Sequence, residues 1–314
     1  MKILVTGGAG FIGSNLVEAL LAAGHSVRIL DNFSAGDRRN LEGFEGDLEV
    51  MEGTVLDPEH CAAACQGVDA VSHQAAFGSA PRSIESPELY SLNNLHGFVV
   101  LCNQARLAGI HRIVYASTSL VYGDSPLSPK QENIRGRAMS PYAASKQGNE
   151  DFSHAFTNAY GMTMVGFRYF NVFGPKQNPK GGYAAVIPQF ITRALLDEPS
   201  TIHGDGEQSR DFTYVENVVQ ANLLALTREV EPGSHILNIA CGVNTSVNAL
   251  YGKIYEQVGC SKPPLQAEVR KGDLRDSLAD ISQARELLGY RDPVGLDEGI
   301  ARTIEWYRSH PGRW

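Results

Sequence analysis

The sequence predicts an α/β fold, in which a doubly wound parallel sheet is joined to a smaller α/β region. Three observations predict it. The first half alternates short apolar runs with longer amphipathic ones, as in chains of β-α units. A glycine-rich turn follows the first apolar run directly, and after Phe170 the segment GPKQNPKGGY marks a loop that leaves the sheet.

Individual elements follow from the hydrophobic periodicity. Within the second region we expect helices near 184–197, 215–229, 246–258 and 295–308, and short strands near 200–203 and 235–240. We expect residues 1–170 to form one domain, with a return of the chain near 213–235, and residues 171–314 to form the other. The strands expected in the first half are 2–6, 27–31, 48–53, 69–75, 112–117 and 162–169.

The composition limits the possible partners and compartments. The chain has 314 residues, of which 43% are hydrophobic, and a net charge of -8 without a block of Lys or Arg, so nucleic acid is an unsuitable partner. No secretory signal is visible and no apolar run could span a bilayer, which predicts a cytoplasmic protein without membrane contact. The five cysteines, an odd number in apolar contexts, indicate reduced thiols rather than a metal site.

The turn VTGGAGFIG at residues 5–13 fits the Rossmann-type dinucleotide fingerprint. Gly10 and Gly13 belong to both possible spacings, which begin at Gly7 or at Gly8. Such a turn lets the backbone approach a pyrophosphate and aims a helix N-terminus at its charge. Asp31 ends the second expected strand, where a carboxylate binds ribose hydroxyls and repels a 2′-phosphate, which favours NAD over NADP. The alternative is that Asp31 caps the turn before NFSAGD.

The segment SPYAASK places Tyr142 and Lys146 four positions apart, on one face of an expected helix. An ammonium near a phenol favours the phenolate, so we expect Lys146 to lower the pKa of Tyr142 and make it a general base. Ser117, Thr118 and Ser119 end the fifth strand at the ligand-binding edge of the sheet and offer hydroxyls there. The alternative is a polar strand end beside a solvated lysine.

Taken together, these motifs resemble the extended short-chain dehydrogenase/reductases. TGGAGFIG, Asp31, STSLVYG and YAASK occur in the order of that family, and RYFNVFGP, DGEQSRDFTYVENVV and GDLRDSLADISQA are similar to its nucleotide-sugar branch. The resemblance implies that Thr118, Tyr142 and Lys146 are catalytic. It also implies an NAD site that contains Gly7, Gly10, Phe11, Ile12, Gly13, Asp31, Asn32, Asp57, Asn94, Tyr142 and Lys146.

The same resemblance implies a UDP-sugar substrate. Arg210 and Arg270 match residues that clamp the pyrophosphate, for which a bidentate guanidinium is well suited. Ser277 stands where epimerases restricted to non-acetylated sugars have a bulky Tyr, so it leaves room for an acetamide. The matching substrate positions are Gly78, Ser79, Asn171, Gln177, Ala185, Phe190, Thr201, His203, Arg210, Arg270, Asp273 and Ser277.

The residue after Ser119 narrows the reaction. Related dehydratases and decarboxylases have acidic residues at this point, whereas Leu120 can neither donate nor accept a proton. The resemblance therefore implies an NAD-dependent UDP-sugar 4-epimerase that forms a homodimer, acting on UDP-N-acetylglucosamine and UDP-N-acetylgalactosamine and able to accept UDP-glucose and UDP-galactose. The alternatives are a UDP-glucose or UDP-glucuronate 4-epimerase and, in a different class, a non-catalytic NAD-binding regulator.

Overall fold

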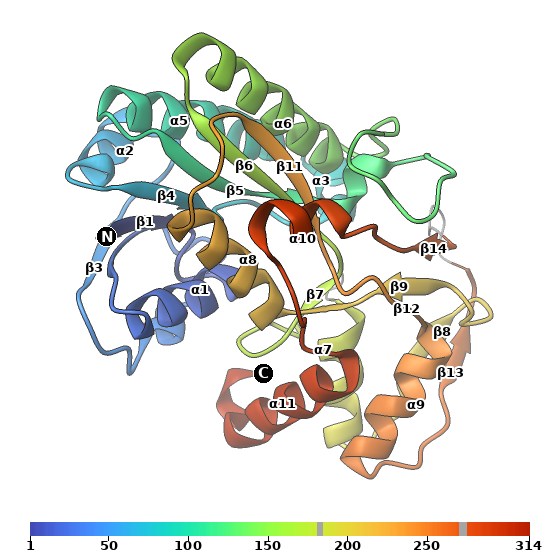
Figure 1. Ribbon diagram of the computed structural model, residues 1–314. Coiled ribbons are helices and arrows are strands. Elements are labelled where there is room, and N and C mark those ends of the chain that lie inside the picture. The colour runs from blue at the N-terminus through green and yellow to red at the C-terminus, as the bar shows by residue number, and fades with distance from the viewer. Residues whose placement is uncertain (181–184, 270–274) are drawn as a thin grey trace.

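The computed structural model describes residues 1–180, 185–269 and 275–314. Its centre is a seven-stranded parallel sheet in the order β11-β6-β5-β4-β1-β2-β3 (Figure 1). The strands are β1 (Lys2–Thr6), β2 (Ser26–Asp31), β3 (Leu48–Glu52), β4 (Ala70–His73), β5 (Arg112–Thr118), β6 (Thr163–Tyr169) and β11 (Ser234–Ile239). The predicted doubly wound α/β fold is confirmed.

Helices cover both faces of this sheet, as Figure 1 shows. One hydrophobic core joins the sheet to helices α1 (Phe11–Ala22), α8 (Val215–Thr227) and α10 (Ser282–Leu288). A second core joins the opposite face to α2 (Pro58–Cys65), α5 (Gly97–Leu107) and α6 (Pro141–Tyr160). Strands β4 and β6 are buried along their whole length, as expected for central strands of a parallel sheet that is covered by helices on both faces.

Between β4 and α5 the chain forms the short helices α3 (Ala80–Glu85) and α4 (Pro87–Tyr90) and the π-helical turn η2 (Ser91–His96). Short 3₁₀ turns are η1 (Arg38–Leu41), η3 (Ser119–Tyr122) and η4 (Pro311–Arg313). Turn η3 begins directly after Thr118, the last residue of β5. The end of β5 is therefore held in a folded turn rather than an open loop.

The chain after β6 builds a third core from α7 (Val186–Leu195), α9 (Val247–Val258) and α11 (Leu296–Ser309). Three small sheets accompany these helices. They consist of β10 (Thr213–Tyr214) with β7 (Val172–Phe173), β13 (Leu265–Ala267) with β8 (Thr201–His203), and β9 (Ser209–Asp211) between β12 (Asn244–Ser246) and β14 (Asp276–Ser277).

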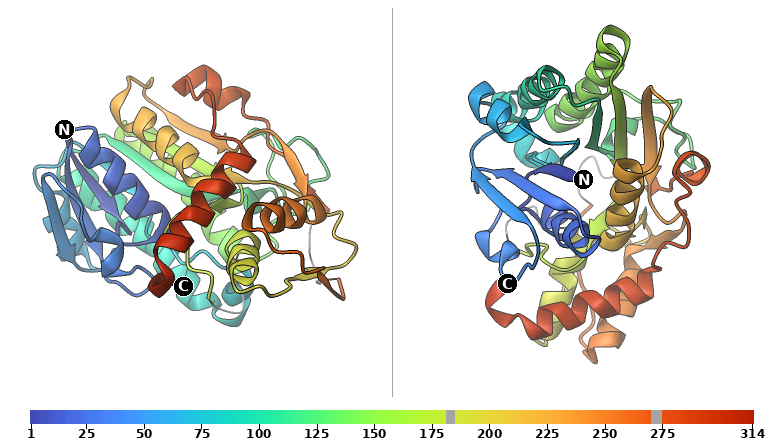
Figure 2. Two further views of the ribbon diagram at one scale, coloured as in Figure 1. Left: turned by 90° about the horizontal axis from the view of Figure 1, so that it is seen from below. Right: turned by 60° about the vertical axis from the view of Figure 1, so that its left-hand side comes forward.

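The two halves of the chain are interleaved. The strand expected near 235–240 is not a short strand of the second region but β11, the seventh strand of the main sheet, paired in parallel with β6. The C-terminus also returns to the first half, where Arg313 Nη1 donates to the carbonyl of Arg39 at 3.0 Å. Both views in Figure 2 show this end lying against the N-terminal part. A division at residue 170 remains a prediction.

Among the described residues, no helix combines the length and apolar character that crossing a membrane requires.

Candidate active site

A cleft of about 500 Å³ lies at the carboxyl ends of the strands of the main sheet. Doubly wound folds bind their ligands at this edge. Its wall combines the glycine turn, the end of β2, the segment after β4, the end of β5, the first turns of α6 and the segment after β6. From the predicted sites it contains Gly7, Gly10, Phe11, Ile12, Gly13, Asp31, Asn32, Gly78, Thr118, Tyr142, Lys146, Asn171 and Gln177.

The glycine turn leaves a space that only glycine permits. Gly7 has φ +69°, in the left-handed region, and the amide of Gly10 donates to the carbonyl of Gly7 at 3.1 Å. A Cβ on Gly13 would lie 2.1 Å from that same carbonyl oxygen. Helix α1 begins at Phe11 immediately beside this space, so its free N–H groups face the cleft. These features fit a dinucleotide pyrophosphate.

Asp31 is 7% exposed at the end of β2. Its Oδ2 accepts from the amide of Ala9 at 2.9 Å, and its Oδ1 accepts from the amide of Phe33 at 2.8 Å. The turn-capping role considered for Asp31 is therefore present, yet the residue also lines the cleft. Each carboxylate oxygen retains a further lone pair, so the same side chain could also accept from ribose hydroxyls.

Helix α6 begins with the local chemistry that its sequence predicts. The side chain of Ser140 accepts from the amide of Ala143, and Pro141 occupies the first turn. Tyr142 and Lys146 follow on one face and line the cleft together with Thr118. The Nζ of Lys146 donates to the carbonyl of Ala116 at 2.8 Å. The predicted meeting of tyrosine, lysine and strand-end hydroxyl is therefore seen in the structure.

The expected lowering of the Tyr142 pKa is wrong when only the groups of the protein itself are considered. Burial raises the pKa of Tyr142 to about 12, although a hydrogen bond with Thr118 acts in the opposite direction. Burial also lowers the pKa of Lys146 to about 8. Desolvation disfavours the charged form of both side chains. Sequence spacing shows that the two side chains share a face, but it does not show how deeply both are buried.

Three of the predicted substrate positions lie in the cleft: Gly78, Asn171 and Gln177. Asn171 has φ +38°, and its Nδ2 donates to the carbonyl of Asp211 at 2.9 Å. Non-glycine residues rarely adopt this backbone conformation, which costs about 1 kcal/mol or more and is often found at functional sites. Asn171 thus joins the cleft to the end of β9.

Arg210 and Ser277 are brought together beside the cleft rather than in its wall. They are register partners on the parallel strands β9 and β14, so their side chains share one face of that small sheet. Ser277 is 7% exposed and Arg210 is half-buried. The backbone connects Arg210 to Asp211, whose carbonyl accepts from Asn171. Arg210 and Ser277 are thus linked to the cleft through the backbone of Asp211.

Other predicted substrate positions have structural roles or lie farther away. The side chain of Ser79 caps α3 and Ala185 precedes α7, while Phe190 is 2% exposed in the third core. Phe190 packs edge-on against Tyr251, so the structure assigns it a core position. Arg270 and Asp273 lie outside the described residues. Thr201 and His203 belong to strand β8.

Two predicted cofactor positions do not line the cleft. Asp57 caps helix α2 by accepting from the amide of Glu59 at 2.8 Å. Asn94 is fully buried, and its side chain bonds both the amide and the carbonyl of Phe77, at 2.9 and 3.0 Å. Since Phe77 lines the cleft, Asn94 shapes the wall through the backbone of its neighbour.

Sequence reasoning missed several residues of the cleft wall. They follow β4 and β2 or end β6: Gln74, Ala75, Ala76, Phe77, Ser34, Ala35, Gly36 and Tyr169. The expected strand at 69–75 extended too far, because β4 ends at His73 and the chain then enters the cleft. The apolar run continues through HQAAF without a turn residue, so no local signal marked the strand end.

Comparison with known proteins agrees with this geometry. The model of the NAD dependent epimerase/dehydratase family matches residues 3–240. UDP-glucose 4-epimerase of Mycolicibacterium smegmatis is 37% identical over 315 residues, which cover 98% of this chain and 99% of that protein. The structure of UDP-glucose 4-epimerase of Thermotoga maritima, solved with UDP-glucose, matches with a TM-score of 0.93 at 36% identity. The match covers 99% of this chain and 100% of that protein.

The similarity extends across substrate classes. UDP-N-acetylglucosamine 4-epimerase of Methanobrevibacter ruminantium, solved with UDP-N-acetylmuramic acid, has a TM-score of 0.94 at 35% identity and covers 98% of both chains. UDP-N-acetyl-α-D-glucosaminuronate decarboxylase of Bacillus cytotoxicus is 30% identical over 98% of both chains. Overall similarity alone therefore does not choose the sugar or the reaction, and the side chains in the cleft must be considered.

Proposed function

The chain belongs to the NAD dependent epimerase/dehydratase family, and from this premise we propose that it epimerises a UDP-hexose at C4 with NAD as cofactor. The observation that supports this most directly is that Thr118, Tyr142 and Lys146 share one cleft with the glycine turn and Asp31. Gly7, Gly10 and Gly13 would hold the pyrophosphate and Asp31 the adenosine ribose.

The character of the cleft favours epimerisation over elimination or decarboxylation. Among the described residues that line it, Asp31 is the sole carboxylate, and both of its oxygens already bond the backbone around the glycine turn. Leu120 lies in the wall close to Thr118. An elimination needs a further acid and base next to the sugar, whereas an epimerisation needs one proton acceptor that later returns the proton.

The chemistry divides between cofactor and protein. When bound, NAD⁺ would supply the acceptor and later the donor of the hydride of C4 of the sugar. Tyr142 accepts the proton of the 4-hydroxyl through its Oη and gives it back when the keto group is reduced. Thr118 donates a hydrogen bond to the same sugar oxygen, and Lys146 supplies positive charge that favours the phenolate. For inversion, the hexose must turn over while the UDP group stays bound, so binding energy is concentrated in the UDP contacts.

Replacing Tyr142 with Phe tests this assignment. We expect kcat for C4 epimerisation to fall about 10³-fold, within the range for loss of a general base, while the affinity for UDP stays within a factor of two. NMR of UDP-sugar mixtures measures the first and calorimetry the second. Tyr160→Phe, at the exposed end of the same helix, is the control. Turnover by the Tyr142→Phe variant at the wild-type rate contradicts the role.

For the substrate, we propose UDP-N-acetylglucosamine and UDP-N-acetylgalactosamine, with UDP-glucose and UDP-galactose also accepted. The small side chain of Ser277, the register partner of Arg210, supports this, because the resembling epimerases that are restricted to non-acetylated sugars have a bulky Tyr at this position. Ser277→Tyr is expected to reduce kcat/KM for the acetylated sugar at least 10-fold more than for UDP-glucose. Competition between the two sugars, followed by NMR, measures the ratio. A wild-type enzyme that turns over UDP-glucose alone contradicts the proposal.

We also propose that the protein acts as a homodimer. An apolar groove on α4, η2, α5 and α6 includes Leu89, Leu92 and Phe152, which are 48%, 49% and 39% exposed. Exposed apolar side chains that lie together commonly form an interface between subunits. Leu92→Glu is expected to give a monomer in size-exclusion chromatography with light scattering. The control is Leu107→Glu, because Leu107 is 61% exposed outside this groove. A wild-type monomer contradicts the proposal.

A further inference from the structure

Helix α6 carries a buried carboxylate that the proposed mechanism does not use. Glu150 lies four residues beyond Lys146 and eight beyond Tyr142, so one side of α6 directs all three toward β5. The Glu150 side chain is 2% exposed and pairs with Arg168, whose side chain is 1% exposed. Arg168 Nε donates to Oε1 at 2.9 Å and Nη2 donates to Oε2 at 2.8 Å.

Stability alone does not account for this pair. The cost of removing two charges from water offsets most of their attraction, and buried pairs can often be replaced by apolar residues without loss of stability. Arg135 Nη1 also lies 3.7 Å from Oε2 of Glu150. One further contact of this carboxylate leads to the active site. Ser117 Oγ donates to its Oε1 at 2.7 Å. Ser117 directly precedes Thr118, so the buried carboxylate is attached to the strand end that carries the proposed catalytic hydroxyl.

Three consecutive residues of β5 are thereby held by three successive turns of α6. The carbonyl of Ala116 accepts from Lys146, the hydroxyl of Ser117 donates to Glu150, and the hydroxyl of Thr118 bonds with Tyr142. The contact between Ser117 and Glu150 joins residues that are 3% and 1% exposed. Its loss would leave the two outer contacts free to shift along the strand, and positional changes of this kind are costly in an active site.

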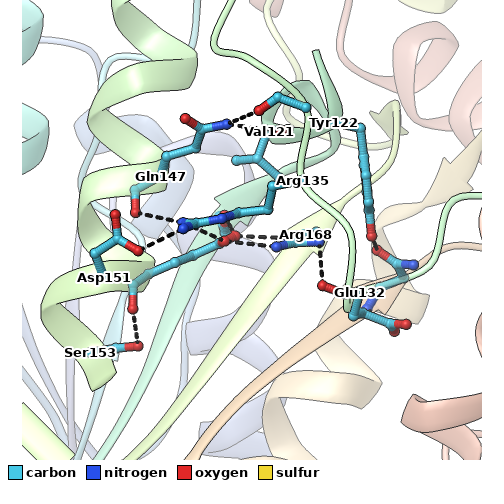
Figure 3. Close-up of polar contacts among 12 residues, drawn as sticks. Val121, Tyr122, Glu132, Arg135, Gln147, Asp151, Ser153 and Arg168 are labelled. Atoms are coloured by element: carbon cyan, nitrogen blue, oxygen red, sulfur yellow. Dashed lines mark hydrogen bonds and ion pairs between the residues drawn. The ribbon is translucent and has the colours of Figure 1, made fainter. Parts of the chain in front are cut away.

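Arg168 also contacts the segments on the other side of the same strand end. It is the register partner of Ser117 on β6, and its guanidinium carbon lies 4.7 Å from the ring centroid of Tyr122 in η3. Its Nη1 donates to the carbonyl of Glu132 at 3.1 Å. Figure 3 shows Arg168 between Glu132 and Tyr122 on one side and the α6 side chains on the other. One guanidinium thus contacts Glu150, the partner of Ser117 before Thr118, and Tyr122 in the turn after Thr118.

We propose that Glu150, oriented by Arg168, is a positioning residue that acts through Ser117 to place the Thr118 hydroxyl and the Lys146 ammonium around Tyr142. This inference rests on the proposed epimerase function. It concerns the rate of the chemical steps rather than the binding of the nucleotide, because neither Glu150 nor Arg168 lines the cleft, and Ser117, which does, directs its hydroxyl to Glu150.

Ser117→Ala tests the inference with the smallest change, the loss of one hydroxyl. We expect kcat to fall about 10-fold, with KM and the calorimetric affinity for UDP within a factor of two of wild type. The matched control is Ser153→Ala. Ser153 is also fully buried, donates to the backbone carbonyl of Glu150 at 2.8 Å and accepts from Tyr115 Oη in the middle of β5 at 3.0 Å. It does not contact the carboxylate, Ser117 or Thr118. Its kcat should equal that of wild type, and both variants should have similar midpoints of thermal unfolding.

A double-mutant cycle with Glu150→Gln examines whether the two residues act together. If Glu150 acts through Ser117, the kcat of the double variant is no lower than the kcat of the more impaired single variant. An unchanged kcat in Ser117→Ala, or an equal loss in Ser153→Ala, overturns the positioning role even if Glu150→Gln fails to fold. These outcomes require an active wild type. A wild type without C4 turnover would instead contradict the proposed function, so the two failures are distinguishable.

Discussion

Replacing Lys146 with Met should separate the catalytic value of a buried ammonium from its effect on stability. Lys146 is 1% exposed, and burial lowers its pKa from 10.5 to about 8. At 1.36 kcal/mol per pKa unit, this difference corresponds to a destabilisation of about 3 kcal/mol whenever the side chain is charged. The hydrogen bond from Nζ to the carbonyl of Ala116 offsets part of it.

The sign depends on pH. Because the folded pKa is below the unfolded one, the unfolded chain binds more protons between about pH 8 and 10.5. The destabilisation is therefore complete below pH 8 and disappears as the pH rises to 10.5. An unsatisfied Ala116 carbonyl costs about 1–3 kcal/mol. At pH 7 the Met variant should be as stable as wild type or up to about 2 kcal/mol more stable, and above pH 10 it should be less stable.

The kcat of the Lys146→Met variant should fall at neutral pH, although its stability does not. Side chains four apart on a helix have Cβ atoms about 5–6 Å apart, and a unit charge at that distance is worth about 3 kcal/mol at an effective dielectric constant of 20. Loss of this charge disfavours the phenolate form of Tyr142. The Met variant should lose about 100-fold in kcat at pH 7, where the ammonium of the wild type is charged, and this loss should shrink as the pH rises above 8.

Urea unfolding at pH 7 and pH 10.5 measures the stability, and NMR measures epimerisation from pH 6 to 10. Lys130→Met is a matched control. Lys130 is also buried, its Nζ donates to the carbonyl of Ser125 at 2.6 Å, and burial lowers its pKa, but it does not line the cleft. It should retain full activity. A Lys146→Met variant that is more than 2 kcal/mol less stable at pH 7, or equally impaired at every pH, refutes the reasoning.

Two further predictions concern the cofactor region. Asp31→Asn places an amide where both carboxylate oxygens accept from backbone N–H groups. It should weaken NAD⁺ binding by about 10–100-fold in calorimetry, the equivalent of one charge-assisted hydrogen bond, and an unchanged affinity would contradict the assignment. Gly13→Ala brings a Cβ within 2.1 Å of the Gly7 carbonyl, so NAD⁺ should no longer raise the melting temperature of the variant. Gly252→Ala, where no atom lies within 4 Å, should instead stabilise α9 by about 1 kcal/mol, and equal behaviour of both variants would show that space is not the cause.

The main sheet and the catalytic cluster could be predicted because their signals are local. Strand β5 is an apolar run with hydroxyls at its end, and α6 begins with a serine cap, a proline and a tyrosine-lysine spacing. Parallel strands present their carboxyl ends at one edge, which brings Thr118 to Tyr142 without any further information.

The small sheet that holds Arg210 and Ser277 carried no such signal. Strands β9 and β14 have three and two residues, too few for a period to be visible. Their pairing joins positions far apart in the sequence, so only the folded chain shows it. The direction of the Tyr142 pKa could not be predicted for a related reason. It depends on burial by segments far away in the sequence, such as α4. The ring centroid of Tyr90 in α4 lies 6.3 Å from that of Tyr142.

The place of β11 in the main sheet has a consequence for biosynthesis. During translation β6 emerges long before β11, its neighbour on the outer side. Until residues 170–233 have followed, the run TMVGFRY has one row of backbone N–H and C=O groups without a partner, which is the arrangement that favours pairing between nascent chains. The nascent chain at this stage therefore carries an unpaired edge at β6, which the folded protein closes with β11.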